Sequence, residues 1–424
     1  MVVHPFFADT FQPPCSGQLD HDFARRGQAQ VQFNDSRWSQ AHAIATDASG
    51  RLLIAAQVGT DQGMRFGLAR MLADGCADMD FGVEGSVIGA FEDDGEANGC
   101  TLNVLPDGRI LLGGLHYSCA ERSLPALALF DADGQLDPAF GQGGRQVVRL
   151  PGDLSSGLRD QWLPTGLPGA EACDVQVQAD GRILLIANRH YTFADHWGVL
   201  ICLHATGALD TTFNGRGFVI VRHLQLNTWL SSVLLQADGR IVVAGSTDFP
   251  LHGLVARYEP DGQLDESFAD HGFLCFNAQG KGTLVSRVIQ QSDGRLQCLG
   301  SSRDPVQGLS LMLSPQGSPC GQVCLTPIGG TSGYWTAALT QADGRVLTVG
   351  STLGGVEADF VVARHHPQGG LDASFGQGAG WVRTRLGHSV DIATSLAQQA
   401  DGKIVVAGSS LMGSSHAVVV RYLG

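Results

Sequence analysis

The sequence is poor in charged residues, and no segment of it concentrates positive charge. Asp, Glu, Lys and Arg make up 16% of its 424 residues, and the formal net charge is −14. Proteins that bind the phosphate backbone of a nucleic acid usually gather Lys and Arg on one surface. We therefore expect no nucleic-acid partner and interpret the acidity as an ordinary solvated surface.

Long apolar runs and a secretion signal are also missing. No apolar run reaches the roughly 18 residues of a membrane-spanning helix, so we expect no membrane span. Residues 1–17 lack the basic start, continuous apolar centre and small-residue cleavage site of a signal peptide. We expect a cytoplasmic protein, with signal-independent secretion as the alternative. Its ten cysteines are then expected to be reduced, several of them as small apolar residues inside strands.

Motifs that carry chemistry are absent as well. The sequence contains no H-E-x-x-H, G-x-S-x-G, Walker or dinucleotide-binding glycine pattern. Cys320 and Cys324 are close in sequence but no second ligand pair follows them, which argues against a zinc site. The stretch DADGQLD at 131–137 lacks the Glu that closes a calcium loop. We therefore expect no catalytic residue, no metal and no cofactor.

What the sequence does contain is a repeat. LLQADGRIVVAGST at 234–247 has near-copies throughout the chain, each centred on a turn glycine. The spacings between these glycines are 58, 73, 58, 55, 50 and 58 residues. The glycines are Gly50, Gly108, Gly181, Gly239, Gly294, Gly344 and Gly402. Repeats of this length without helical periodicity indicate a closed or stacked β architecture.

Each copy predicts four short strands. Two runs rich in Val, Ile and Leu flank an Asp-Gly pair, which we interpret as a hairpin with a two-residue turn and positive φ at its central residues. A third apolar run follows, then a Leu-Asp-x-x-Phe motif as in LDESF at 264–268, then a fourth run. We name these strands A to D, from the centre outward.

Seven units of four strands predict an all-β fold, a seven-bladed β-propeller of four-stranded antiparallel blades. A solenoid or a β-sandwich is the alternative, but units of about 55 residues fit a blade better. The last unit ends after strand C, whereas an unattached D-type strand stands at 28–33. We therefore predict that this N-terminal strand closes the last blade. The expected organisation is a lead segment at 1–18 and one propeller domain at 19–424.

The two motifs together resemble the bacterial delta-sixty repeat family, whose tandem units carry LDxSFG, PDGKIVVAG and ARY segments. The likeness extends over residues 19–424. It implies a propeller and no particular activity, because the family has no catalytic motif that could be carried over to this sequence.

The recurring Asp of Leu-Asp-x-x-Phe is expected to be structural. An Asp after a turn accepts hydrogen bonds from nearby backbone, and the Leu and Phe fill the gap between blades. The Arg residues of the C strands are placed to pair with these carboxylates. They are Arg70, Arg257, Arg364 and Arg421.

Function is expected on one end of the ring. The A–B turns and C–D connections share one face and are uniform, whereas the B–C and D–A loops share the other, which we call the variable face. Its candidate binding residues are aromatic or His: Trp38, Tyr117, Trp162, His190, Tyr191, His196, Trp197, Trp229, Tyr334 and Trp335. Trp and Tyr combine contact area with a polar group. The long segments 150–173 and 188–198 are predicted to wall the main concavity.

The sequence thus predicts a non-catalytic binding or scaffold propeller, a monomer that recognises a protein or a glycan through this face. The alternative is a hydrolase or lyase with a metal or His/Asp site over the central channel. His190, Asp195 and His196 are the nearest candidates for such a site.

Overall fold

A computed structural model describes residues 15–93, 95–118, 123–151, 174–192, 195–224, 226–328, 332–354, 356–412 and 414–424. For residues 190–192, 195 and 412 it describes the backbone alone. No helix within these ranges is long and apolar enough to cross a membrane.

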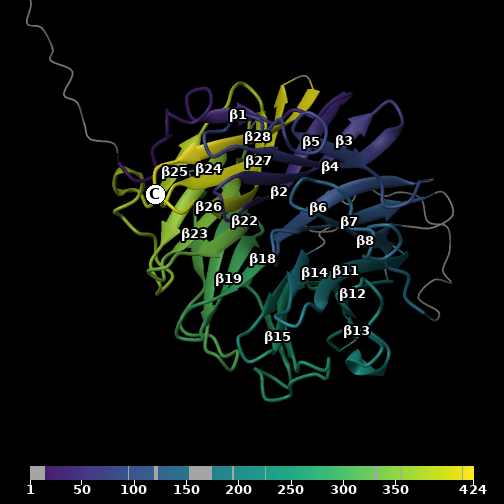
Figure 1. Cartoon of the computed structure of the whole chain (residues 1–424). Coiled ribbons are helices and arrows are strands. Elements are labelled where there is room, and N and C mark those ends of the chain that lie inside the picture. Colours follow the sequence, from purple (N-terminus) through teal and green to yellow (C-terminus); the bar gives the residue numbers. More distant parts are fainter. Residues whose placement is uncertain are drawn as a thin grey trace, which may run out of the picture.

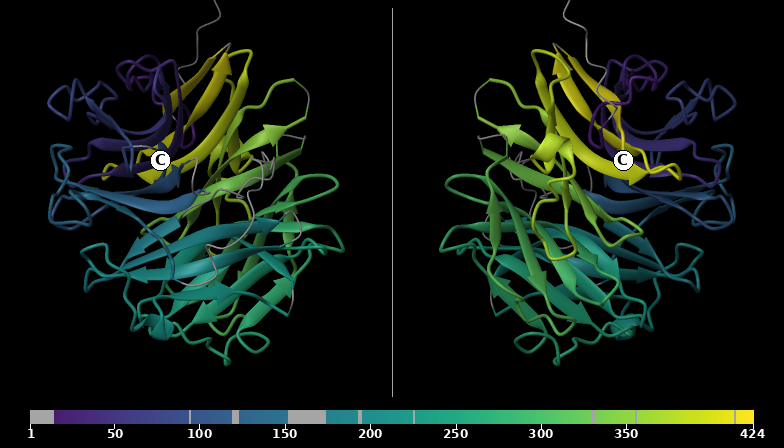
Figure 2. Two further views of the ribbon diagram at one scale, coloured as in Figure 1. Left: turned by 90° about the vertical axis from the view of Figure 1, so that its right-hand side faces the viewer. Right: turned by 90° about the vertical axis from the view of Figure 1, so that its left-hand side faces the viewer.

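The chain forms seven four-stranded antiparallel sheets arranged around a common axis, so the predicted seven-bladed propeller is confirmed (Figures 1 and 2). Blades 1 to 3 are β2–β5 (Trp38–Thr46, Leu52–Thr60, Gly63–Met71, Ser86–Gly89), β6–β9 (Glu96–Val104, Ile110–Tyr117, Leu124–Phe130, Arg145–Val147) and β10–β13 (Asp174–Val177, Ile183–Thr192, Asp195–Leu203, Phe218–Val221). Blades 4 and 5 are β14–β17 (Asn227–Leu235, Ile241–Asp248, Gly253–Tyr258, Phe273–Phe276) and β18–β21 (Thr283–Gln290, Leu296–Ser302, Gln307–Leu313, Cys324–Thr326). Blade 6 is β22–β25 (Ser332–Thr340, Val346–Leu353, Phe360–His365, Trp381–Thr384).

Both ends of the chain build blade 7. It consists of β26 (Val390–Gln398), β27 (Ile404–Met412), β28 (Ser414–Tyr422) and, at its outer edge, β1 (Gln28–Gln30). The register pairs Gln28 with Val420, and the Val31 amide continues the contact by donating to the Ala417 carbonyl at 2.8 Å. The predicted closure is confirmed, with a strand shorter than the expected 28–33.

The A–B turns differ from the two-residue turn expected from the sequence. In blade 4 the Gly239 amide donates to the Gln236 carbonyl at 2.9 Å, and the Gln236 amide donates to the Arg240 carbonyl at 2.8 Å. Gly239 has φ +85°, whereas Asp238 is not in the left-handed region. The longer turn lets the Asp238 carboxylate accept from the Arg240 amide at 3.1 Å. Only the glycine is therefore required to have a positive φ.

Replacing this glycine tests its backbone role. Gly239→Val is expected to lower the free energy of unfolding by about 1–3 kcal/mol, because a β-branched residue is strained at this φ. Urea unfolding of the purified variant measures the effect. A variant with the stability of the parent chain would show that the turn tolerates a side chain.

A cluster of Arg, Asp and Phe joins neighbouring blades on the face of the A–B turns. Arg257 of β16 pairs with Asp265 at 2.6 Å, lies 4.7 Å from the centre of the Phe268 ring, and donates to the Pro315 carbonyl of blade 5. The expected pairing of C-strand Arg with Leu-Asp-x-x-Phe Asp is confirmed in the other blades that have both: Arg70–Asp78 at 2.7 Å, Arg364–Asp372 at 2.8 Å and Arg421–Asp20 at 2.9 Å.

Where the C-strand Arg is missing, the Asp is paired by the Arg of the A–B turn, which also approaches the Asp in blades 1, 4 and 6. Cys202 takes the place of the Arg in blade 3, and burial raises the pKa of its thiol to about 12. Asp210 there has Arg182 at 3.7 Å, and Asp137 of blade 2 has Arg109 at 3.1 Å. The carboxylate is therefore paired in both blades, but neither has the guanidinium of the C strand.

Candidate functional site

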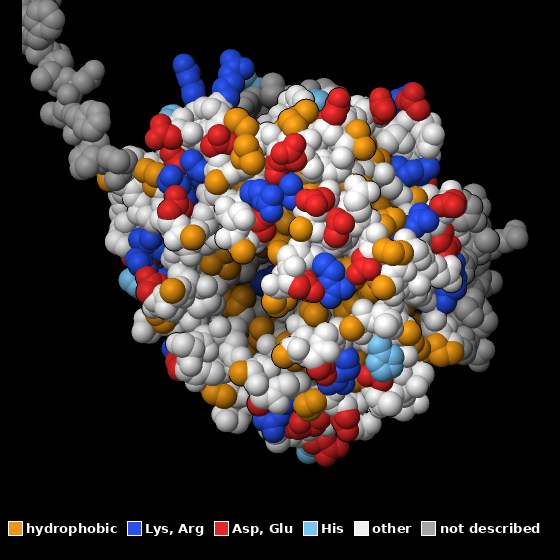
Figure 3. All heavy atoms as spheres, viewed as in Figure 1, with side chains coloured by type: hydrophobic (Ala, Val, Ile, Leu, Met, Phe, Trp, Pro, Cys, Tyr) orange, Lys and Arg blue, Asp and Glu red, His pale blue; other side chains and the backbone are white. Residues whose placement is uncertain are grey.

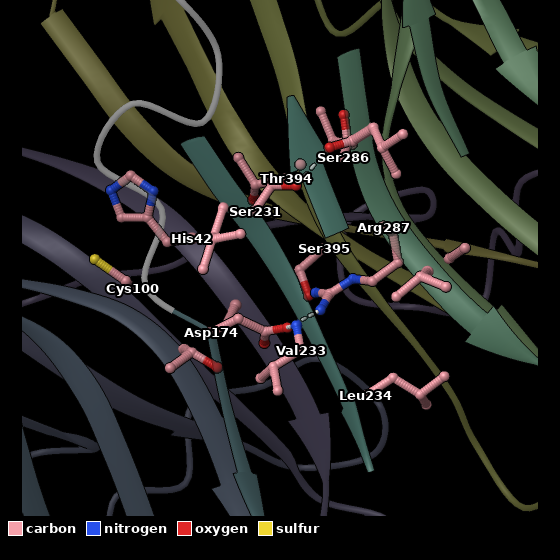
Figure 4. A pocket seen from close by; sticks show the side chains of 18 of the residues that line it. His42, Cys100, Asp174, Ser231, Val233, Leu234, Ser286, Arg287, Thr394 and Ser395 are labelled. Atoms are coloured by element: carbon pink, nitrogen blue, oxygen red, sulfur yellow. Dashed lines mark hydrogen bonds and ion pairs between the residues drawn. The ribbon is translucent and has the colours of Figure 1, made fainter. Parts of the chain in front are cut away.

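A cavity of about 630 Å³ lies on the axis of the ring. Its wall is formed by the innermost strands of all seven blades, β2, β6, β10, β14, β18, β22 and β26, together with residues at the ends of β15 and β19 (Figure 4). The cavity therefore exists because the ring closes, and no single blade contains it.

A β-bulge recurs in the inner strands and determines which side chains line the cavity. In six of them the pairing register shifts at one residue, which stands eight positions before the turn glycine. The extra residue has no partner on the neighbouring strand. These residues are His42, Cys100, Ser231, Ser286, Thr336 and Thr394, and all of them line the cavity. The seventh inner strand, β10, begins after this position.

Three of the bulge hydroxyls connect a blade to the next one. Thr336 donates to the Ala393 carbonyl at 2.8 Å, and Thr394 donates to the Ala41 carbonyl at 2.9 Å. Ser231 likewise donates to the carbonyl of Val285. A hydroxyl has one hydrogen, and here it is used within the protein. What these groups still offer to the cavity are oxygen lone pairs.

One ion pair stands in the wall of the cavity. Arg287 of β18 reaches Asp174 of β10 at 2.6 Å, as Figure 4 shows. The same Asp174 carboxylate accepts from the Val233 amide of β14 at 2.9 Å. Both charges are therefore matched inside the protein, and three blades are linked at this point.

Within the described residues, two further polar atoms of the wall have no hydrogen-bond partner. Asn98 of β6 is 5% exposed, and its Oδ1 has no hydrogen-bond partner. The Nε2 atom of His42 is likewise without one, and burial lowers the pKa of this imidazole to about 4. His42 is therefore neutral near pH 7, and both atoms are buried.

At the variable face, the cavity is bordered by aromatic rings and a carboxylate. Trp229 and Tyr334 line it half-buried, and Asp248 lies at the end of β15. His196 of β12 stacks on Trp229 with ring centres 4.0 Å apart, and its Nε2 lies 3.6 Å from Asp248 Oδ2. Burial raises the pKa of the Asp248 carboxyl.

The structure thus brings together three of the predicted site residues. Trp229 and Tyr334 line the cavity, and His196 supports Trp229 from behind. Asn188 fixes the same hairpin to β14, because its amide group exchanges two hydrogen bonds with the backbone of Leu230, at 2.8 and 2.7 Å. The described residues of 188–198 therefore stand behind the cavity wall and do not line it.

Four other predicted residues lie away from the cavity. Trp38 begins β2 and packs on Gly59, Tyr117 ends β7, and the Trp197 ring lies 4.8 Å from the Arg222 guanidinium. Trp335 is 1% exposed and packs edge-on against His365, with ring centres 5.9 Å apart, so it belongs to the core.

The remaining predicted residues have no described side chain. His190 and Tyr191 stand at the end of β11, and His190 is paired in register with His196. Trp162, with residues 152–173 of the predicted wall, lies outside the described residues.

Sequence reasoning missed the residues of the bulge and their neighbours. Asp174, Arg287, Asn98 and Asp248 carry the polar chemistry of the cavity. A signal was present for the bulge: when the repeats are aligned on the turn glycine, the position eight residues earlier holds only His, Cys, Ser or Thr. The same narrow choice of small or polar residues at one position of every repeat indicates a common structural role.

Charges of both signs are interspersed with apolar and neutral side chains on the face drawn in Figure 3. Among the described residues, no three His, Cys, Asp or Glu side chains gather as a metal site would require.

Comparison with known proteins finds a propeller family in part of the chain. A family model described as "Domain of unknown function (DUF5122) beta-propeller" matches residues 105–140, 236–268, 341–375 and 399–423, each beginning at an A–B turn. No curated protein matches the sequence.

Solved structures similar to this one share little sequence with it. A protein of unknown function from Dyadobacter fermentans DSM 18053 is 12% identical, with 94% of this chain and 98% of that chain covered and a TM-score of 0.49. The polysaccharide lyase Uly1 is 13% identical, with 94% and 92% covered and a TM-score of 0.48. A K499G mutant of the NanB sialidase from Streptococcus pneumoniae is 10% identical, with 94% and 92% covered and a TM-score of 0.44.

Proposed function

We propose that this protein is a non-catalytic binding propeller that takes the end of a glycan into its axial cavity from the variable face. The observation that carries the proposal is the cavity itself. Its volume of about 630 Å³ falls in the range of about 300–1,000 Å³ typical of small-molecule sites. We also propose that the repeats are of the delta-sixty type, on the strength of their two recurring motifs.

The composition of the wall supports a sugar. The rings of Trp229 and Tyr334 offer apolar surface for the C–H groups of a pyranose, and the wall oxygens offer acceptors for its hydroxyls. A protein partner buries about 800 Å² on each side of a typical interface, which calls for a broad surface. A narrow concavity suits the end of an oligosaccharide better.

The fixed charges of the wall support binding without turnover. A general base needs a carboxylate that is free to take a proton. Asp174 is held by Arg287 at 2.6 Å and by the Val233 amide at 2.9 Å, so it is already fully engaged.

One observation favours the second candidate, a hydrolase or lyase. The Asp248 carboxyl borders the cavity, its pKa is raised by burial, and His196 stands 3.6 Å away. A carboxylic acid with a raised pKa is what acid catalysis on a glycosidic bond requires. Glycosidases usually use two carboxyl groups, and Asp248 provides one of them.

A tryptophan substitution separates these functions from a purely structural role. After a glycan array has identified a ligand of the full chain, Trp229→Ala is expected to weaken its binding at least tenfold in calorimetry, as for a central aromatic anchor. Trp38→Ala is the matched control, because Trp38 is also half-buried but packs on Gly59. Equal affinities of the two variants would contradict the site. Recovery of the glycan intact supports binding, whereas cleavage seen by mass spectrometry would establish the second candidate.

A further inference from the structure

Four side chains of the axial wall use a donor hydrogen inside the protein. The hydroxyl hydrogens of Ser231, Thr336 and Thr394 are used on backbone carbonyls. Asn103 likewise donates from Nδ2 to the Val175 carbonyl at 3.2 Å. The three hydroxyl groups therefore offer a ligand their oxygen lone pairs, which suits a ligand that carries N–H or O–H donors.

The charge of the wall is negative once its ion pair is counted. Arg287 and Asp174 cancel at 2.6 Å, and His42 is neutral near pH 7. Asp248 remains. Among the described residues, the only basic side chain within 4.0 Å of Asp248 is His196, at 3.6 Å.

An aromatic ring stands beside this carboxylate. Trp229 and Asp248 border the same cavity and both lie against His196. An ammonium group is attracted both by a carboxylate and by the face of an indole.

We propose that the axial cavity selects a sugar carrying a free ammonium group, an amino sugar, over neutral and acidic sugars. Asp248 pairs with the ammonium group and Trp229 lies beside it. The hydroxyl oxygens of the wall accept hydrogen bonds from the remaining N–H and O–H groups of the sugar. This inference rests on the proposed glycan site and adds the class of sugar.

The test compares three trisaccharides on the full chain by calorimetry at about pH 7, because burial raises the pKa of Asp248 and a higher pH favours its ionised form. The glucosamine trimer is expected to bind at least tenfold more tightly than the N-acetylglucosamine trimer, and a uronic acid trimer more weakly still. Asp248→Asn is expected to remove most of the preference for the amine and to leave the affinity for the N-acetylated trimer within about twofold. Asp61→Asn is the control, because it removes a carboxylate that is 78% exposed in the β3–β4 turn on the same face.

The outcomes distinguish this inference from the proposed function. Equal binding of the three sugars, tighter binding of the acidic one, or an unchanged preference in Asp248→Asn overturns the selection of an ammonium group, while the glycan site stands. Putrescine is a diamine without a sugar ring. If putrescine binds in a manner that depends on Asp248 and no sugar binds, the selection of an ammonium group is supported and the glycan site is overturned. If neither the sugars nor putrescine bind, both the glycan site and the selection of an ammonium group are contradicted.

Discussion

Removal of residues 1–35 is expected to lower the melting temperature by on the order of 10 °C or to abolish cooperative unfolding. The deletion takes away β1, the outer strand of blade 7, and exposes the edge of β28. It also removes Phe23, Val31 and Phe33, which are buried to 5% exposure or less. Each such side chain stabilises the fold by about 1.5–3 kcal/mol, and the total is a large part of the stability of a typical domain.

The deletion also removes one partner of a buried ion pair. Asp20 is the ion-pair partner of Arg421 at 2.9 Å, and both are at most 5% exposed. The deletion therefore also removes the carboxylate that pairs with Arg421, and this loss adds to the destabilisation. Calorimetry of a chain that begins at Cys15, which keeps all these contacts, is the control. A peptide of residues 15–35 added in trans is expected to restore part of the loss; an unchanged melting temperature in the deletion would contradict the closure.

Asp265→Asn is expected to have the largest effect of any single substitution proposed for this chain, about 3–5 kcal/mol of unfolding free energy. Asp265 and Arg257 are both 4% exposed and pair at 2.6 Å. Arg257 also donates to the Pro315 carbonyl of blade 5, so the change weakens a joint between blades as well as one blade. Chemical unfolding at neutral pH measures the difference.

The pH dependence of that difference provides an independent check. Burial alone would raise the pKa of Asp265, but hydrogen bonds from Ser267 and Arg257 hold it below its usual value. A carboxyl whose pKa is lower in the folded than in the unfolded chain stabilises the fold above the unfolded pKa of about 4. Its contribution is lost as the pH falls further, so the gap between parent and variant is expected to narrow in acid.

The matched control for this substitution lies in the turn of the same blade. Asp238→Asn alters a carboxylate that is 55% exposed and is expected to cost less than about 1 kcal/mol. If the two variants lose the same unfolding free energy, or if the difference between parent and Asp265→Asn does not change with pH, the buried ion pair does not contribute more to stability than an exposed carboxylate.

The architecture was predictable because its determinants are local and repeated. The Leu-Asp-x-x-Phe motif places an Asp and a Phe at fixed distance from a C-strand Arg, as in Asp265, Phe268 and Arg257, and the structure joins all three. The last unit likewise lacks a fourth strand of its own, and the N-terminal strand β1 takes that place. The predicted turn length was wrong because an Asp-Gly pair is compatible with turns of different length. The sequence does not specify which of these turns forms.

The site was less predictable because it depends on distances across the ring. Trp229 and Tyr334 were found from their residue type, but Trp335 has the same type and is buried in the core. Alternation along a strand assigns side chains to two faces, and the bulge changes that assignment in the middle of the strand. The Arg287–Asp174 pair joins residues 113 positions apart on non-adjacent blades, which no local pattern encodes.

The closure in blade 7 has a topological consequence. The Gly17 amide donates to the Leu423 carbonyl, and the Leu423 amide donates to the Gln18 carbonyl, each at 2.8 Å. The backbone from Gly17 to Leu423 is thus a nearly complete circuit whose two ends already touch. A circular permutant that joins these ends by a short linker and opens the chain at an exposed A–B turn of another blade would keep every sheet. In such a molecule no unit is first or last, and the ring needs no capping repeat of the kind that an open solenoid requires.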